Sequence, residues 1–182
     1  MDKYTLNRDE SILLIIDIQE RLAPAMKYEE RVIKNTDILI RVAEEMDMPI
    51  LVTEQYPKGL GATVSEISDN LKGAQVFEKV LFSVCTDDFI RALERRERKK
   101  IIVVGMETHV CVLQSVRELL KLDYNVFVVS DAISSRFEEN HSNGLDLMRD
   151  MGAVITNTET VLFDLLKEAG TSEFRVLSKL IR

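Results

Sequence analysis

The chain has 182 residues, of which 46% are hydrophobic, which is enough for one well-buried domain and short for two. Its formal net charge of −7 disfavours nucleic acids and anionic membranes, which are bound through clustered cations. The two cysteines form no disulfide framework, no charged-then-apolar signal segment opens the sequence, and no apolar run is long enough to span a bilayer. We therefore expect a single domain over residues 1–182, located in the cytoplasm, without nucleic-acid or membrane partners.

Strands and helices are expected to alternate along the whole chain, with no linker or repeat between them. Strands are placed where short apolar runs lie between turn residues, and helices where apolar residues recur at helical spacing. In chain order, the expected elements are a strand at 11–18, a helix at 29–48, a strand at 50–53, a loop at 57–61, a short helix from 63 or 65, a strand at 75–80, a helix at 87–98, a strand from 101, a helix at about 108–122, a strand at 125–130, a helix at 138–151, a strand at 153–156, a helix from 157 or 158 to about 168, and a final helix from 172.

This alternation predicts an α/β fold of three layers. Helices cover both faces of a doubly wound, six-stranded parallel sheet of the Rossmann-like type. We expect the strand at 11–18 and the strand that begins at 101 to be neighbours at the centre of the sheet. A crevice opens where the strand order reverses, and open α/β sheets bind their ligands there.

Three chemically active residues lie at or just beyond the ends of predicted strands. Asp17 ends the apolar run of the first strand, Lys79 that of the third, and Cys111 follows the fourth. Each alone has an ordinary structural explanation: a carboxylate caps the next loop, a lysine faces solvent, and a free cysteine packs as a small hydrophobe. Together, at the carboxyl ends of parallel strands, they can converge on one cleft. They would then supply the base, cation and nucleophile that attack on a carbonyl requires.

The segment around Cys111 is the most informative part of the chain. Four β-branched residues at 101–104 run without alternation, which suits a strand covered on both faces. Gly105 then allows a sharp turn. Cys111 falls in the first turn of the following helix, near its positive end, and this position is expected to favour the thiolate over the thiol.

Five segments carry a resemblance to a known family. They are Leu14-Ile15-Ile16-Asp17-Ile18-Gln19, Val52-Thr53-Glu54-Gln55-Tyr56-Pro57-Lys58-Gly59-Leu60-Gly61, Lys79 with Phe82-Ser83, Gly105-Met106-Glu107-Thr108-His109-Val110-Cys111-Val112, and Val129-Ser130-Asp131-Ala132. In their order and spacing, over nearly the whole chain, they resemble the isochorismatase-like cysteine hydrolases, and within them the eukaryotic-type isochorismatase-domain proteins and their bacterial relatives.

The resemblance implies an isochorismatase-like fold with a catalytic triad of Asp17, Lys79 and Cys111. It also implies a non-proline cis peptide bond between Met106 and Glu107, and a dimer or larger homo-oligomer. The backbone amides of Glu107 and Cys111 are then the expected donors to an oxyanion.

Two departures from related enzymes narrow the expected chemistry. Isochorismatases proper, which hydrolyse a vinyl ether, lack the cysteine, so Cys111 points to amide-type hydrolysis, as in nicotinamidases and ureido hydrolases. Nicotinamidases carry a histidine-rich metal-binding segment after the second strand, whereas residues 54–59 contain no histidine. His109 and His141 are too few and too far apart for a local zinc cluster. We therefore predict a hydrolase without metal or cofactor that cleaves a C–N bond of a small amide or ureido substrate through a thioester.

Substrate contacts are expected from loops around the triad. Gln55 and Tyr56, after the second strand, are candidates for contact with the substrate, or for packing or a subunit interface. Gln19 is a further candidate, because it lies close to Asp17 in the chain, and structural anchoring is its alternative role.

Two other functions are open at this point. The chain could be a non-catalytic binding or scaffold protein that keeps the fold, which the complete triad argues against. Alternatively, Cys111 could be a redox sensor. That function is weakened because Cys85, on a different loop, is not an obvious resolving cysteine.

Overall fold

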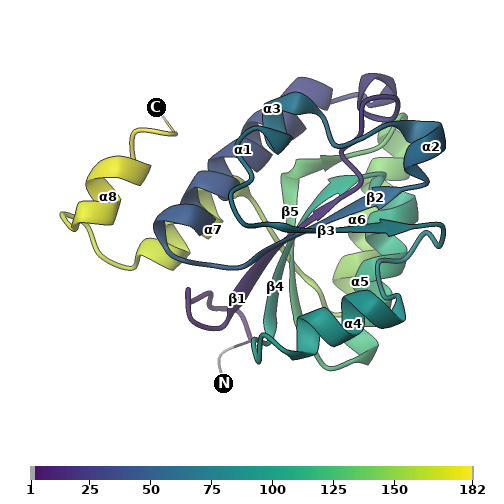
Figure 1. Cartoon of the computed structure of the whole chain (residues 1–182). Coiled ribbons are helices and arrows are strands. Elements are labelled where there is room, and N and C mark those ends of the chain that lie inside the picture. The colour runs from purple at the N-terminus through teal and green to yellow at the C-terminus, as the bar shows by residue number, and fades with distance from the viewer. Residues whose placement is uncertain (1–2, 182) are drawn as a thin grey trace.

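The structure is a computed structural model, and it describes residues 3–181 of the chain. Its strands are β1 (Ser11–Ile16), β2 (Ile50–Gln55), β3 (Gln75–Lys79), β4 (Lys100–Met106), β5 (Asn125–Ser134) and β6 (Val154–Thr156). Its helices are η1 (Ala23–Ala25), α1 (Glu29–Glu45), α2 (Pro57–Leu60), α3 (Ser65–Ser68), α4 (Asp87–Glu94), η2 (Thr108–Val112), α5 (Leu113–Lys121), α6 (Glu138–Asp150), α7 (Thr158–Leu166) and α8 (Ser172–Leu177). Figure 1 shows their arrangement around the sheet.

The six strands form one parallel sheet in the order β3-β2-β1-β4-β5-β6. The predicted fold is therefore confirmed, and so is the pairing of β1 with β4, in which Leu13 lies opposite Ile102 and Ile16 opposite Gly105. The strand order reverses at this pair, because β2 and β3 lie beyond β1 whereas β5 and β6 lie beyond β4. The carboxyl ends of β1 and β4 thus flank the position where such sheets bind ligands.

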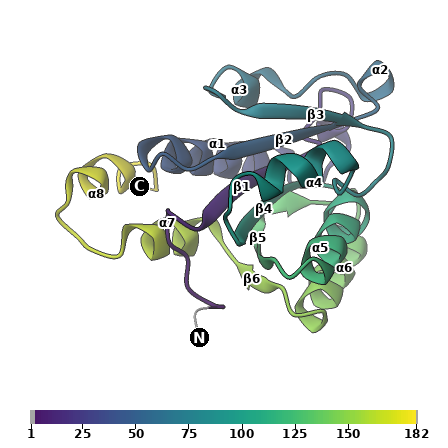
Figure 2. The same cartoon turned by 60° about the horizontal axis from the view of Figure 1, so that its bottom comes forward.

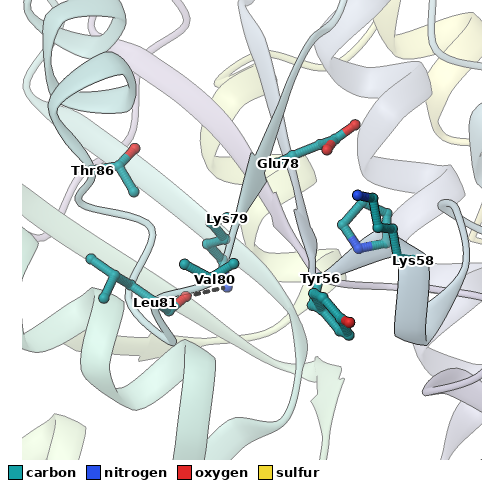
Figure 3. Close-up of a pocket in the computed structure, with 8 residues that line it drawn as sticks. Tyr56, Lys58, Glu78, Lys79, Val80, Leu81 and Thr86 are labelled. Atoms are coloured by element: carbon teal, nitrogen blue, oxygen red, sulfur yellow. Dashed lines mark hydrogen bonds between the residues drawn. The ribbon is translucent and has the colours of Figure 1, made fainter.

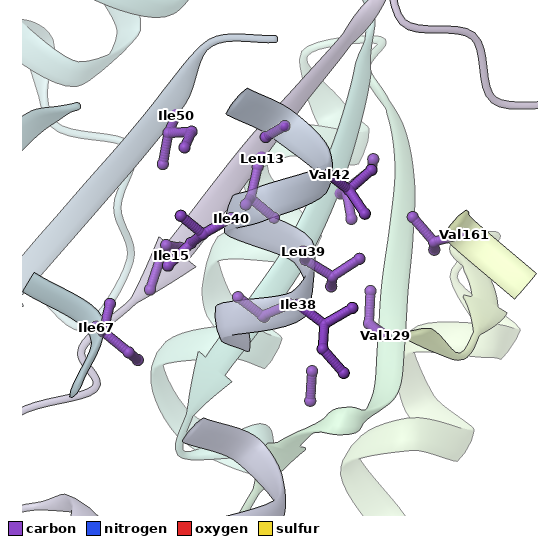
Figure 4. Packing of buried hydrophobic residues seen from close by; sticks show 14 of the residues in the cluster. Leu13, Ile15, Ile38, Leu39, Ile40, Val42, Ile50, Ile67, Val129 and Val161 are labelled. Atoms are coloured by element: carbon purple, nitrogen blue, oxygen red, sulfur yellow. The ribbon is translucent and has the colours of Figure 1, made fainter. Parts of the chain in front are cut away.

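Helices cover both faces of the sheet, as two views of the molecule show (Figures 1 and 2). Every residue of β1 is buried. Alternate side chains of a strand point to opposite faces, and helices cover both faces here. Leu13 and Ile15 belong to the hydrophobic cluster formed with α1, α3 and α7 (Figure 4). Ile12, Leu14 and Ile16 belong to the cluster formed with α4, α5 and α6. Burial on both sides explains why this strand is a continuous apolar run.

Three helices differ from the prediction. The expected loop at 57–61 contains α2, which begins at Pro57 because the fixed φ of proline suits a first helical position. The helix α1 ends at Glu45, earlier than predicted, and Asp47 then adopts a left-handed conformation. The helix α4 ends at Glu94, also earlier than predicted. Among residues 3–181, no helix is both long and apolar enough to cross a membrane.

Two further boundaries concern the carboxyl edge of the sheet. The strand β5 continues to Ser134, beyond the predicted end, because it resumes pairing with β4 after an irregularity between Val103 and Gly105. The single helix expected at 108–122 is divided into a π-helical turn, η2, and the α-helix α5. The segment that carries Cys111 is therefore wider than an ordinary first turn.

Gly105 marks the closest approach between β1 and β4. Its φ is 133°, and a Cβ atom at this position would lie 2.0 Å from the carbonyl oxygen of Ile16. Glycine is required here both by the backbone conformation and by the absence of space. This contact sets the end of β4 directly against the end of β1, immediately before Asp17.

We predict that Gly105→Ala lowers the free energy of unfolding by about 3 kcal/mol or more, because backbone strain and overpacking add at this position. Urea unfolding followed by circular dichroism measures the change. Gly73→Ala is the matched control: Gly73 also has a positive φ, of 71°, but has no atom within 4 Å of the added Cβ. Its expected loss is about 1–2 kcal/mol, from conformation alone. Equal losses in the two variants would contradict the close contact.

Candidate active site

Asp17 follows β1 and is completely buried. It has a positive φ of 54°, which ends the strand and turns the chain at the carboxyl edge. Its backbone N–H donates to the carbonyl oxygen of Thr53 at 3.1 Å, and the Thr53 hydroxyl donates to its Oδ1 at 2.7 Å. The carboxylate is thus held by the end of the neighbouring strand β2.

Lys79 is the last residue of β3, and its side chain is also buried, with 1% exposed. Its Nζ donates to Oδ2 of Asp17 at 2.7 Å and to Oε1 of Gln55 at 2.7 Å. It also donates to the carbonyl oxygen of Phe82 at 3.0 Å and to that of Leu81 at 3.3 Å, the contact that Figure 3 shows. The ammonium is therefore surrounded by oxygen acceptors, of which one carries the opposite charge.

Cys111 lies in η2 and is 5% exposed. Its thiol is hydrogen-bonded to Asp17, so the thiol, the carboxylate and the Lys79 ammonium form a continuous chain of contacts. The pKa of Cys111 is raised to about 12, chiefly by burial and also by the carboxylates of Asp17 and Glu107, while Lys79 opposes the rise. The expectation that this position favours the thiolate is therefore wrong, because desolvation and negative neighbours outweigh the single cation. The resting sulfur is a neutral thiol at pH 7.

The turn that carries Cys111 is fixed from several sides. The Met106–Glu107 peptide bond is cis. The carbonyl oxygen of Glu107 accepts hydrogen bonds from the N–H groups of Val110 at 3.1 Å and Val112 at 3.2 Å. Glu107 and Cys111, whose backbone amides are the expected oxyanion donors, thus lie in one short segment at the end of β4.

Side chains from the β5–α6 region hold the same turn. Oε2 of Glu107 accepts from the backbone N–H of Arg136 at 3.2 Å and from its Nε at 3.1 Å. The hydroxyl of Thr108 lies 2.9 Å from Nδ1 of His141. His109 Nδ1 lies 2.9 Å from the hydroxyl of Ser135. The two histidines thus bond to different partners. Among residues 3–181, no group of three or more His, Cys, Asp or Glu side chains could hold a metal ion.

The structure places Gln19 and Gln55 in supporting positions. The amide of Gln19 donates to the carbonyl oxygens of Gln55 at 3.0 Å and Gly61 at 2.7 Å, and it accepts from the N–H of Gln55 at 2.7 Å. Gln55 accepts from Lys79 and donates to the carbonyl oxygen of Val80 at 2.9 Å. Both amides are bonded to protein groups, so Gln19 anchors the loop after β2 and Gln55 orients the lysine.

Tyr56 is the candidate from this loop that faces outward, with 54% of its surface exposed. It lines a groove of about 490 Å³ along the outer side of β3 (Figure 3). Tyr56 and Lys58 form one wall, and Leu81 and Thr86 form the other. Lys79 borders this groove through β3, whereas Asp17 and Cys111 do not line it.

Thr53, His141 and Ser115 were not expected as neighbours of the site, whereas the loop that contains Arg136 was expected to be able to line it. Thr53 carried a usable signal, because it precedes the end of β2 and faces the same edge as Asp17. His141 and Ser115 come from the helices α6 and α5. Their contacts depend on how helices pack, which periodicity alone does not specify.

Comparison with known proteins adds independent information. A protein-family model described as "Isochorismatase domain" matches residues 11–160. The chain is 41% identical over 177 residues to the "Secreted isochorismatase effector Isc1" of Phytophthora sojae (strain P6497), and this match covers 94% of this chain and 84% of that protein. It is 38% identical over 181 residues to the "Isochorismatase family protein 1A" of Dictyostelium discoideum, covering 93% of this chain and 85% of the relative.

A solved structure gives the same result for the fold. The "MAR1 Ribonuclease from Caenorhabditis elegans" superposes with a TM-score of 0.93 at 36% sequence identity. The match covers 97% of this chain and 92% of that one.

We predict that Lys79→Met destabilises the protein by about 3–5 kcal/mol, because the buried Asp17 carboxylate then lacks its cation. Urea unfolding at pH 7 measures this loss. The double variant Asp17→Asn/Lys79→Met should lose less than the sum of the two single variants, since it removes both charges together. Arg149→Met is the control, because its ion pair with Asp146 is 56% and 73% exposed, and it should change stability little. If the double variant lost as much stability as the two single variants together, the two buried charges would not be coupled.

Proposed function

The chain belongs to the isochorismatase family, and from this premise we propose that it is a metal-independent cysteine hydrolase that cleaves a C–N bond of a small amide or ureido substrate. One observation carries the proposal. A buried thiol, a buried carboxylate and a buried ammonium are bonded in sequence at the carboxyl edge of the sheet. These are the groups that nucleophilic attack on a carbonyl requires.

In the first step, Asp17 accepts the proton of Cys111 as the sulfur attacks the carbonyl carbon of the substrate. Because burial raises the pKa of Cys111 to about 12, the thiolate is not formed in advance. Proton transfer along the existing hydrogen bond therefore accompanies the attack. Lys79 remains beside the oxygen of Asp17 to which it donates.

The second step completes the acyl transfer. The carbonyl oxygen becomes an oxyanion, and we assign the backbone N–H groups of Glu107 and Cys111 as its donors. The oxyanion then re-forms the carbonyl, the C–N bond breaks, and the leaving amine takes the proton from Asp17. A thioester on Cys111 is left. Asp17 next accepts a proton from water as the water oxygen attacks the thioester, the C–S bond breaks, and the sulfur takes the proton back from Asp17, which releases the acid and restores the free thiol.

Tyr56 is the proposed contact with the substrate among the three candidates, because it directly follows β2 at the carboxyl edge of the sheet and its ring is exposed. Gln19 and Gln55 support the site instead, since their amides are bonded to protein groups. Exposed loop residues in general determine which substrate a fold accepts.

A solved relative suggests another substrate class, because the protein from C. elegans is named a ribonuclease. For this chain the net charge of −7 argues against a polyanionic substrate. The 5% exposure of Cys111 likewise suits a small molecule that enters a confined site. An RNA oligonucleotide belongs in the substrate panel as the test of this alternative.

Self-association and a cytoplasmic location are part of the proposal. Val80, Leu81 and Phe82 follow β3 and are 75%, 59% and 53% exposed, which is an unusual run of apolar surface for an isolated subunit. Cys85 and Cys111 are both free, as expected in a reducing compartment.

We predict that Cys111→Ala lowers kcat by about 1,000-fold or more on any substrate found in a panel of small amides and ureido acids. Cys111→Ser should be nearly as inactive, because a serine hydroxyl is a poor nucleophile without a base tuned to it. Asp17→Asn should lose turnover and also slow alkylation of Cys111, since loss of the proton acceptor outweighs the lower pKa that the thiol has without the carboxylate. Adding Asp17→Asn to Cys111→Ala should cost little more. Wild-type turnover by Cys111→Ala would replace this proposal with the binding-protein alternative.

We also predict that hydrolysis is unchanged after dialysis against EDTA and 1,10-phenanthroline. The donors that zinc prefers are absent from residues 54–59, which contain no histidine or cysteine. Steady-state rates before and after chelation measure the effect. Loss of activity that zinc restores would contradict the prediction.

A further inference from the structure

Ser115 joins the segment of Cys111 to the loop that holds Lys79. It lies in the first turn of α5 and is completely buried. Its hydroxyl donates to the carbonyl oxygen of Cys111 at 2.6 Å and accepts from the backbone N–H of Val84 at 3.0 Å. The first contact is local to the helix. The second leaves the helix and crosses to the loop between β3 and α4, where Val84 is 1% exposed.

The loop that Ser115 contacts is the one that supplies acceptors to Lys79. The carbonyl oxygens of Leu81 and Phe82, which precede Val84 in this loop, accept hydrogen bonds from Nζ of Lys79. A second contact pins the same loop one turn further along α5: the hydroxyl of Ser83 donates to Oε2 of Glu118 at 2.5 Å. Residues three apart share a helix face, so both contacts hold the loop against one side of α5.

We propose that Ser115 is a positioning residue that aligns the Lys79 ammonium with the Cys111 thiol across Asp17, by fixing the β3–α4 loop to the helix that carries the nucleophile. The inference rests on the proposed function, because it assumes that these three groups act together. The sheet alone does not set this alignment. Lys79 comes from the edge strand β3 and Cys111 from η2, which follows the central strand β4, and the strands β2 and β1 lie between β3 and β4.

The local hydrogen bond that a helical serine commonly makes explains only one of the two contacts of Ser115. Serine in a helix often donates to the carbonyl four residues earlier, which satisfies the hydroxyl locally. In this chain the hydroxyl oxygen also accepts from a backbone N–H of a different segment. Removing the hydroxyl would leave that buried N–H without its partner and free the loop at Val84, two residues after Phe82.

The test measures alkylation of Cys111 by iodoacetamide, followed by mass spectrometry at pH 8 and over a pH series, so that no substrate is needed. Cys111 and Cys85 lie in different tryptic peptides, because Arg91 and Lys100 separate them. Alkylation of Cys85, which lies in the loop that the variants release, is therefore followed separately, and free N-acetylcysteine in the same solution serves as the rate reference. Ser115→Ala should slow alkylation of Cys111 at least about fivefold, since a displaced Lys79 stabilises the thiolate less. Ser115→Thr, which keeps a hydroxyl, should stay within about twofold of the wild type.

A merely structural role would change the rate in the opposite direction, because loosening the core exposes the thiol. Leu119→Ala is the matched control: Leu119 lies in the same helix, is completely buried and has no polar group. It should destabilise the protein without slowing alkylation. If Ser115→Ala does not fold, Ser83→Ala releases the second contact of the same loop and should slow alkylation in the same direction.

Unchanged or faster alkylation in the folded Ser115→Ala variant, or in Ser83→Ala where the first does not fold, would overturn the inference. The Asp17→Asn variant separates this outcome from failure of the proposed function. If Asp17→Asn slows alkylation and the serine variant does not, the inference alone is wrong. If Asp17→Asn leaves the rate unchanged, the proposed role of Asp17 as base is wrong as well.

Discussion

A carboxylate and an ammonium that are both removed from water must satisfy each other, and the Asp17–Lys79 pair imposes this demand on the surrounding structure. The ion pair, in which Nζ of Lys79 lies 2.7 Å from Oδ2 of Asp17, uses only one proton and one oxygen. The other protons of Lys79 and Oδ1 of Asp17 need further partners. Gln55, the Leu81 and Phe82 carbonyls and Thr53 provide those partners. Three consecutive strand ends and the loop after β3 are therefore fixed by a single buried pair.

The same pair explains how a thiol can be both protected and reactive in the proposed mechanism. With a pKa raised to about 12, the sulfur of Cys111 stays protonated at rest and is a poor target for oxidants. Moving its proton to Asp17 converts a neutral thiol and a carboxylate into a thiolate and a neutral acid. The net charge beside Lys79 does not change in this transfer, so the buried site need not accommodate a new charge.

The sequence was sufficient for the features that follow from periodicity and strand order. Asp17, Lys79 and Cys111 were expected to converge because each follows an apolar run, and parallel strands end at one edge. Side-chain direction was not predictable in the same way. Gln55 was a candidate for substrate contact or for packing, and its amide bonds to Lys79 and to the carbonyl oxygen of Val80, partners that strand periodicity does not specify. The thiolate was wrongly expected because desolvation, the largest cause of the raised pKa of Cys111, depends on tertiary packing.

Substrate selection must then come from outside the buried pair. Beside Cys111, the charge of Asp17 is balanced by Lys79 and that of Glu107 by Arg136. Arg136 differs from Lys79 in that 53% of its side chain is exposed. Tyr56 and Arg136 place exposed aromatic and polar groups on the loops after β2 and β5, and loops of this kind vary more than the elements that they connect. A fixed set of reacting groups on rigid strands, with recognition placed on loops, allows one fold to hydrolyse different small molecules.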